Sequence, residues 1–346
     1  MYATERWEEV RLRRLKSPVP VSTAHPLVSR SRVPSRGDAV VTSSIAILGA
    51  PSSIGIKPYD DATIRRLDLA PGALREQGLV ARLGARDLGD VLPPPYLDVV
   101  RPAGRPRNEA GVATYSRTLA GRVAEARREG AFTLVLGGDC SIVLGCLLGL
   151  RASGISRLGL VYIDAHADFA TPESSRTGSA ASMCLALAVG RGDTPLARLD
   201  GDRPLVRPDD VVLIGRSDGD GERWYGEDAL AVLPILDLRR SGLRKRGAVR
   251  TAEVALERVS MPKLDGFWIH LDADVLEATI MPAVDSPEAG GLTLEELSAL
   301  LDPLVRHPRA LGLEVTIYDP GLDPDQTSAG RLAGLLEQVL TSDPRR

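Results

Sequence analysis

Short apolar runs alternate with segments of helical periodicity along the chain from residue 44 onward. Most of the runs are apolar on both faces, which is typical of parallel strands that helices cover on both sides. The runs span residues 44–50, 132–138, 158–166, 210–215, 231–237, 266–274 and 310–319. Because strands alternate with helical segments, the pattern predicts an α/β fold with right-handed crossovers.

Two of the helical segments give clear signals. Residues 111–130 place apolar side chains at helical spacing, and residues 293–307 open with Thr293 and Glu296. A threonine followed three positions later by a glutamate is the spacing of a capping box, in which each side chain satisfies a backbone N–H of the other residue. We therefore expect a helix over each range.

Residues 1–43 differ from the rest of the chain. They are rich in Arg, Ser, Pro and Val and show no sustained periodicity, which predicts a mostly disordered extension. Residues 44–346 contain no stretch with the composition of a linker, so we expect a single catalytic domain there.

Composition narrows the range of partners. The chain of 346 residues carries 43 Lys and Arg against 46 Asp and Glu, a formal net charge of −3, and only 4% aromatic residues. Neither figure favours nucleic acid or an anionic membrane as a partner. No apolar stretch approaches the roughly 20 residues of a membrane-spanning helix. Three cysteines, an odd number, argue against a disulfide framework and for a reducing compartment, so we expect a cytoplasmic protein.

Polar side chains gather where the apolar strands end. The segment DAHAD places Asp164, His166 and Asp168 after one strand, and LDAD places Asp272 and Asp274 at the end of another. Side chains two apart on a strand point the same way, and sites in parallel sheets form at the carboxyl ends of the strands. We therefore expect these five side chains to converge.

Cys140 ends a third strand, directly after Gly137, Gly138 and Asp139. The two glycines allow neighbouring backbone or a substrate to approach closely. Carboxylates gathered in one place repel each other and need a cation, and mixed carboxylate and imidazole ligands suit Mn²⁺, Fe²⁺, Ni²⁺ or Zn²⁺. Two metals that share carboxylates would generate a hydroxide at neutral pH, so the expected chemistry is hydrolysis.

Each motif taken singly also has a plain structural explanation. Asp-x-Asp at a strand end is usually a helix cap or turn, and a histidine inside an apolar strand, such as His270, is usually a hydrogen-bonded core residue. Asp-x-His-x-Asp at a buried strand end is harder to explain in that way, because buried ionisable groups are costly unless they are paired or bind a metal. The two motifs on separate strands together favour a metal site.

Three segments, taken in order, resemble motifs of the ureohydrolase family, which includes arginase, agmatinase and formiminoglutamase. They are GGDCS at 137–141, DAHAD at 164–168 and LDADVLEATIMPAVDSPEAGGLT at 271–293. The resemblance implies a three-layer α/β/α fold around an eight-stranded parallel sheet, as in arginases and deacetylases. It also implies a binuclear manganese site that hydrolyses a small guanidino compound to urea and an amine, and a homo-oligomer, either trimer or hexamer.

The resemblance implies six metal ligands by position: Cys140, Asp164, His166, Asp168, Asp272 and Asp274. Asp164 and Asp272 would bridge the two metals, and Cys140 stands where the family has histidine. A thiolate suits Zn²⁺, Fe²⁺ or Ni²⁺ better than Mn²⁺, so we expect one metal position to be weakened, altered or empty. His270, two residues before Asp272, is a further candidate that would orient the metal ligands without binding the metal itself.

The substrate-binding motifs depart from the family more strongly. The resemblance makes Asp168 and Glu314 the candidate catalytic residues, but Ala170, Ala181 and Ile317 stand where arginases have an asparagine, a proton-relaying histidine and a guanidinium-binding glutamate. Arginine itself is therefore a poor substrate for this chain. A modified guanidine or amidine fits better, and a hydroxyguanidine is attractive because its lower basicity reduces the need for the missing acid and relay.

Two other readings of the sequence stay open. One is a non-catalytic or regulatory member of the family. The other is a mononuclear deacetylase-like amidohydrolase that uses Asp164, His166 and Asp272, although the His–His pair that such enzymes need is missing from the sequence. In the loop at 216–222, Asp218 and Asp220 are weak candidates for contacts with a substrate amine.

Overall fold

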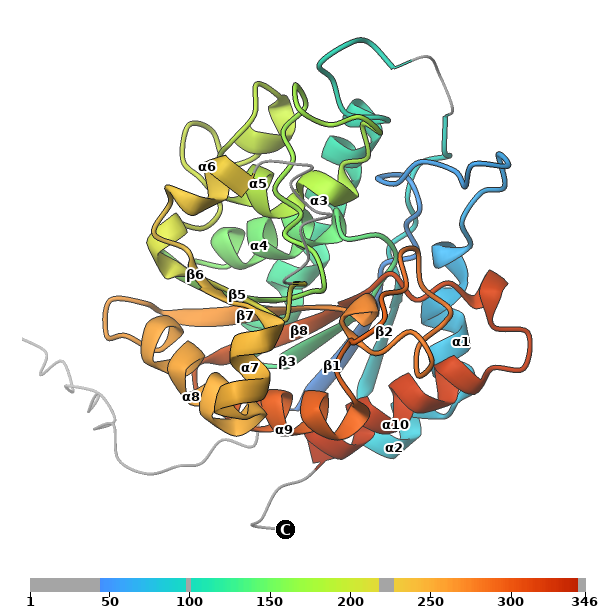
Figure 1. The fold of residues 1–346 in the computed structure, drawn as a ribbon, viewed down its shortest axis with the longest axis vertical. Helices are drawn as coiled ribbons and strands as arrows, with labels where there is room; N and C mark the ends of the chain where they lie inside the picture. The colour runs from blue at the N-terminus through green and yellow to red at the C-terminus, as the bar shows by residue number, and fades with distance from the viewer. Residues whose placement is uncertain (1–43, 98–100, 218–226, 342–346) are drawn as a thin grey trace, which may run out of the picture. The chain divides into compact units, whose positions relative to one another are not determined.

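Eight parallel strands form one sheet at the centre of the fold (Figure 1). The structure is a computed structural model and describes residues 44–97, 101–217 and 227–341. The strands are β1 (Ile45–Gly49), β2 (Arg86–Asp90), β3 (Phe132–Leu136), β4 (Leu158–Ile163), β5 (Val211–Ile214), β6 (Leu236–Leu238), β7 (Gly266–Asp272) and β8 (Ala310–Thr316). Their order across the sheet is β2-β1-β3-β8-β7-β4-β5-β6.

Two strands differ from the apolar runs of the sequence. β2 lies at one edge of the sheet and is mostly exposed, so its sequence, RDLGD, carries no apolar run. β6 lies at the other edge of the sheet and begins at Leu236. The expected strand began at residue 231, which is instead the last residue of α6 (Glu227–Ala231). Edge strands bury less side-chain surface, which explains why hydrophobicity marks them poorly.

Helices cover both faces of the sheet and make the fold three-layered (Figure 1). One face carries α3 (Glu109–Arg128), α4 (Ile142–Ala152) and α5 (Cys184–Ala188). The other carries α1 (Ala70–Glu76), α2 (Leu79–Leu83), α7 (Arg240–Arg246), α8 (Ala248–Val259), α9 (Leu294–Val305) and α10 (Thr327–Thr341). The expected three-layer α/β/α fold with an eight-stranded parallel sheet is therefore confirmed.

Local sequence signals account for the helix ends. The capping box of α9 is present: Thr293 Oγ1 accepts from the Glu296 N–H at 3.1 Å, and Glu296 Oε2 accepts from the Thr293 N–H at 3.0 Å. Short 3₁₀ turns span Leu67–Leu69, Ala181–Met183, Pro195–Arg198, Pro208–Asp210, Ala273–Val275 and Pro320–Leu322. The turn at Ala273–Val275 follows β7 directly and carries Asp274.

Some expectations concern residues that the structure does not describe. The predicted extension, residues 1–43, and the loop candidates Asp218 and Asp220 all lie outside the described ranges. Over the residues that are described, no helix is both long and apolar enough to cross a membrane.

Candidate metal centre

The candidate site lies at the carboxyl ends of the neighbouring strands β3, β8, β7 and β4. Strand register pairs Tyr162 of β4 with His270 of β7, and His270 with Glu314 of β8. Two positions farther along, Asp272 is paired with Thr316. Because side chains two apart on a strand share a face, the site consists of two stacked layers, with the Tyr162–His270–Glu314 layer deeper in the sheet.

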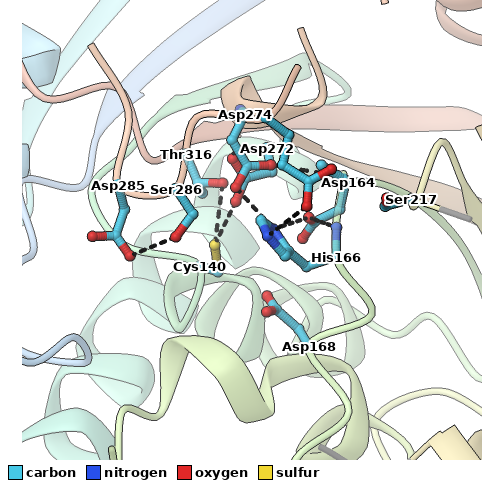
Figure 2. Close-up of polar contacts among 12 residues, drawn as sticks. Cys140, Asp164, His166, Asp168, Ser217, Asp272, Asp274, Asp285, Ser286 and Thr316 are labelled. Carbon is cyan, nitrogen blue, oxygen red and sulfur yellow. Dashed lines mark hydrogen bonds and ion pairs between the residues drawn. The ribbon is translucent and has the colours of Figure 1, made fainter. Parts of the chain in front are cut away.

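Asp164, His166 and Asp274 form the first of two groups that place ligand atoms together. Their donor atoms all lie within 4.8 Å of one another. His166 Nδ1 is 3.0 Å from Asp274 Oδ2 and 3.4 Å from Asp164 Oδ1, and Figure 2 shows the three side chains pointing toward one another. Asp164 Oδ2 is buried and has no hydrogen-bond partner in the described part of the chain. An orphaned buried carboxylate oxygen of this kind is what a bound cation would satisfy.

Cys140, His270 and Asp272 form the second group, and their donor atoms also lie within 4.8 Å of one another. The Cys140 thiol donates to Asp272 Oδ2 at 2.9 Å and lies 3.6 Å from Thr316 Oγ1 (Figure 2). Cys140 can reach this place because two glycines, Gly137 and Gly138, follow β3. A Cβ atom on Gly138 would collide with the backbone of Ser52.

Beneath Asp272, His270 and Glu314 form a fully buried pair. His270 Nδ1 is 2.8 Å from Glu314 Oε1, and the imidazole stacks on the Tyr162 ring with centroids 4.0 Å apart. Within the described ranges, neither His270 Nε2 nor Glu314 Oε2 has a hydrogen-bond partner. The pair is therefore held together through Nδ1 and Oε1, while His270 Nε2 makes no hydrogen bond to a described residue.

Burial and mutual repulsion disturb the titration of the clustered groups. Burial, followed by repulsion from Asp274, raises the pKa of Asp164 to about 7. Burial and the charges of Asp274 and Asp164 raise the pKa of Asp272 well above its ordinary value, and burial together with Asp272 does the same to the pKa of the Cys140 thiol. Burial alone would lower the pKa of His166, but the interactions with Asp274 and Asp164 together outweigh it and the pKa rises. A bound cation would relieve this repulsion.

Neither of the two candidate catalytic residues is a member of these groups. Asp168 is separate from both groups in Figure 2, and its Oδ2 accepts a hydrogen bond from the Tyr162 hydroxyl at 2.6 Å. It lines the cavity described below. Glu314 is fully buried in the deeper layer, and the described residues that line the cavity do not include it. The structure thus brings Asp168, but not Glu314, to a place that a substrate can reach.

A cavity of about 570 Å³ opens over the two groups. Cys140, His166, Asp168, Asp272 and Asp274 all contribute to its wall. The groups therefore lie at the bottom of a pocket large enough for a small molecule.

Comparison with known proteins identifies the family. The sequence model of the Arginase family matches residues 43–341. The chain belongs to the arginase family. Arginase from Bacillus caldovelox is 33% identical over 84% of this chain and 96% of that protein, and arginase from Bacillus subtilis (strain 168) is 31% identical over 86% and 97%. The solved structure of the Bacillus caldovelox arginase covers 87% of this chain and 99% of its own at 30% identity, with a TM-score of 0.77.

Family membership confirms the predicted resemblance to ureohydrolases and the predicted enzymatic class. As a member of the arginase family, the chain is a hydrolase of amidino carbon–nitrogen bonds. The cavity nevertheless carries the substitutions that the sequence indicated. Ala181 and Ile317 line it, whereas Ala170 is fully buried. Ile317 has a φ of 68°, an unusual backbone conformation for a β-branched residue.

The remaining charged groups of this arginase-family cavity are paired with opposite charges. Asp285 binds Arg65, and Glu288 Oε2 lies 3.1 Å from Arg240 Nη2. Glu288 also faces the first group, with Oε1 3.7 Å from His166 Nε2. Sequence reasoning missed Asp285 and Glu288, and the only signal for them was their position inside the motif at 271–293.

Proposed function

We propose that the protein is a metal-dependent hydrolase that cleaves a carbon–nitrogen bond of a modified guanidino compound to give urea and an amine. The observation that carries this proposal is the convergence of Asp164, His166 and Asp274 at the bottom of the cavity, with Asp164 Oδ2 left unsatisfied by the described residues. Family membership supports the reaction class, since the curated relatives are arginases.

The proposed metal ligands are those implied by the resemblance: Cys140, Asp164, His166, Asp168, Asp272 and Asp274. Asp164, His166 and Asp274 supply oxygen and imidazole donors that suit Mn²⁺. The donors near Cys140 include sulfur, which favours Zn²⁺, Fe²⁺ or Ni²⁺. When bound, such a cation supplies Lewis acidity to water and to the substrate.

The chain's own residues orient the ligands and move protons. Glu288 faces His166 Nε2 and is itself held by Arg240, so its charge favours the ring orientation that points Nδ1 at Asp164 and Asp274. A carboxylate behind a ligating histidine is the usual arrangement in metal sites. Asp168, whose carboxylate Tyr162 holds against the cavity wall, is our candidate for accepting a proton during hydrolysis.

The cavity wall supports a substrate of low basicity. Two of its acids outside the metal groups, Asp285 and Glu288, are neutralised by Arg65 and Arg240, and Ile317 adds an apolar surface. A guanidinium cation would find no uncompensated carboxylate among these residues. A hydroxyguanidine, which is less basic, has less need of one.

The wider organisation is proposed on the same grounds. We propose that residues 44–346 act as one catalytic domain and that the protein is a cytoplasmic homo-oligomer, a trimer or hexamer as the resemblance implies. The three cysteines Cys140, Cys146 and Cys184 are free, as expected in a reducing compartment.

The test is urea release from a panel of guanidino compounds that includes arginine and hydroxyguanidines, after reconstitution with Mn²⁺, Zn²⁺ or both. We expect metal-dependent urea release that is faster with a hydroxyguanidine than with its parent guanidine. Stoichiometric metal binding with no urea from any compound would show that this chain is a non-catalytic member. Release of a carboxylic acid from acylated amines would instead show a deacetylase-like enzyme.

A further inference from the structure

We propose that His270 is a metal ligand, and that Cys140, His270 and Asp272 together hold a zinc-type ion with sulfur, nitrogen and oxygen donors. The inference deepens the proposed function, on which it rests for the role of the metal. It changes the composition of the centre: one metal site carries a thiolate from the turn after β3 and an imidazole from β7. The neighbouring group of Asp164, His166 and Asp274 retains donors that suit manganese.

The first support is proximity. A ring nitrogen of His270, the sulfur of Cys140 and an oxygen of Asp272 lie within 4.8 Å of one another. Metal–ligand bonds to sulfur and nitrogen are about 2.0–2.3 Å long, so ligand atoms around one ion are about 3–4 Å apart. Small side-chain adjustments would therefore suffice to bring these three donors around one ion.

The second support is the unsatisfied nitrogen. His270 is fully buried, its Nδ1 is engaged by Glu314, and Nε2 has no hydrogen-bond partner in the described part of the chain. Leaving a buried polar atom without a partner costs about 1–3 kcal/mol. If His270 served only in packing, a hydrogen-bond partner for Nε2 would make the fold more stable. A metal ligand, in contrast, needs this nitrogen without a hydrogen-bond partner.

The third support is the carboxylate behind the ring. Glu314 Oε1 lies 2.8 Å from His270 Nδ1, and in the tautomer that donates a hydrogen bond from Nδ1–H to Glu314 the Nε2 lone pair is available. Ligating histidines almost always donate their second N–H to a carboxylate, carbonyl or water. Stacking on Tyr162, with ring planes 16° apart, holds the imidazole in place. Glu314 is therefore a positioning residue for His270.

The donor set decides which metal is preferred. Cysteine, histidine and carboxylate side chains are the ligands of zinc, and three protein ligands with one open position are typical of catalytic zinc. Because Cys140, His166 and Asp272 all line the same cavity, an ion in the sulfur-containing group would face the same substrate as an ion beside His166. The sulfur changes the metal preference of only one of the two groups, which then binds manganese less well than zinc.

The experiment measures metal content and the spectrum of the cobalt-substituted full-length protein. Protein stripped with chelator is equilibrated with Zn²⁺ and Mn²⁺ and analysed for both metals per chain, and a parallel sample receives Co²⁺. Cobalt bound to a thiolate gives a strong near-ultraviolet band. We expect zinc to occupy one position in the wild type, and Cys140→Ser to lose both the band and most of the zinc.

The decisive variants are His270→Ala and Glu314→Gln. We expect His270→Ala to weaken zinc binding by at least about 100-fold and to shift the cobalt spectrum, and Glu314→Gln, which keeps size and packing, to weaken it by about 10- to 100-fold. His307→Ala removes an imidazole that packs against Phe267 and belongs to neither group, so it should leave both readouts unchanged.

Zinc affinity and a cobalt band that stay at wild-type level in Glu314→Gln and in folded His270→Ala would overturn the inference. If His270→Ala does not fold, Glu314→Gln and His270→Asn decide by the same two readouts. Urea release is recorded on the same samples. An inactive wild type with normal zinc and a normal cobalt spectrum would contradict the proposed function and leave the metal site standing.

Discussion

The sulfur of Cys140 lies 2.9 Å from Asp272 Oδ2, so a thiol occupies the edge of the carboxylate cluster at the end of β3. This contact links the turn after β3 to the end of β7, two strands that are separated in the sheet by β8. The thiol points into the site and does not pack away from it (Figure 2). A cysteine in this place changes the donor atoms of the site without changing its framework.

Replacing Cys140 by histidine should change the metal that is bound. An imidazole in place of the thiol removes the sulfur donor and leaves nitrogen and oxygen ligands, which bind manganese better. We expect Cys140→His to raise the ratio of bound Mn²⁺ to Zn²⁺ by roughly tenfold or more. Metal analysis after equilibration with both ions is the measurement. An unchanged ratio would mean that residue 140 does not contact a metal.

Replacing Asp164 by asparagine should flatten the pH dependence of the metal-free protein. Burial and Asp274 raise the pKa of Asp164 to about 7, while an aspartate in the unfolded chain titrates near about 3.9. Between these values the folded state holds a proton that the unfolded state has lost, so stability falls as the pH rises from about 4 to about 7.

Urea denaturation of chelator-treated wild type and Asp164→Asn at about pH 5 and about pH 8 tests this. From the lower to the higher pH, we expect the free energy of unfolding to fall by about 1–3 kcal/mol more in the wild type than in the variant. The exposed Asp202→Asn is the matched control and should behave as wild type. If the wild type is more stable at the higher pH, the change in stability has the opposite sign and the prediction is wrong.

Replacing Ile317 by glutamate should redirect specificity. Ile317 lines the cavity and has a φ of 68°, a conformation that an unbranched side chain adopts with less strain. A carboxylate there can bind a guanidinium by a charge-assisted hydrogen bond worth about 1.5–3 kcal/mol. We expect kcat/KM for an unmodified guanidine to rise roughly tenfold or more relative to a hydroxyguanidine. Ile317→Gln, with the same size but no charge, should show no such shift.

Replacing Gly138 by alanine should disrupt the placement of Cys140. The added Cβ would collide with the backbone of Ser52, which cannot move as a flexible side chain can. We expect Gly138→Ala to destabilise the fold by about 1–3 kcal/mol and to lower metal content. Gly72→Ala is the control, because nothing lies within 4 Å of a Cβ at that helical position. Equal stability of the two variants in thermal unfolding would show that the close approach is unimportant.

The sequence predicted the central strands and the clear helices well, because these elements bury long apolar stretches. Expectations for 132–138, 158–166, 266–274 and 310–319 each overlap an observed strand. The edge strand β2 was missed because its residues are mostly exposed. The pattern of hydrophobic residues identifies buried elements, so it does not predict strands and helices whose side chains are mostly exposed.

For the site, the sequence indicated which carboxylates converge but not how the surrounding side chains pair. The alternation in DAHAD and LDAD predicted that five side chains would converge. Asp164, His166 and Asp274 meet in one group and Asp272 lies in the other, whereas Asp168 belongs to neither. The His270–Glu314 pair depends on the register of β7 against β8, two strands 44 residues apart in sequence at this point, and spacing carries no information about register. The same holds for the pairing of Glu288 with Arg240.

The most direct test of the central claim is urea release by the metal-reconstituted wild type, compared with Asp274→Asn in the same assay. Asp274 contributes a donor to the first group, and its removal leaves His166 without its nearest carboxylate. We predict metal-dependent urea release from at least one hydroxyguanidine by the wild type, and none above background by Asp274→Asn. Equal urea release by both proteins, or none from the fully metal-loaded wild type, would contradict the account.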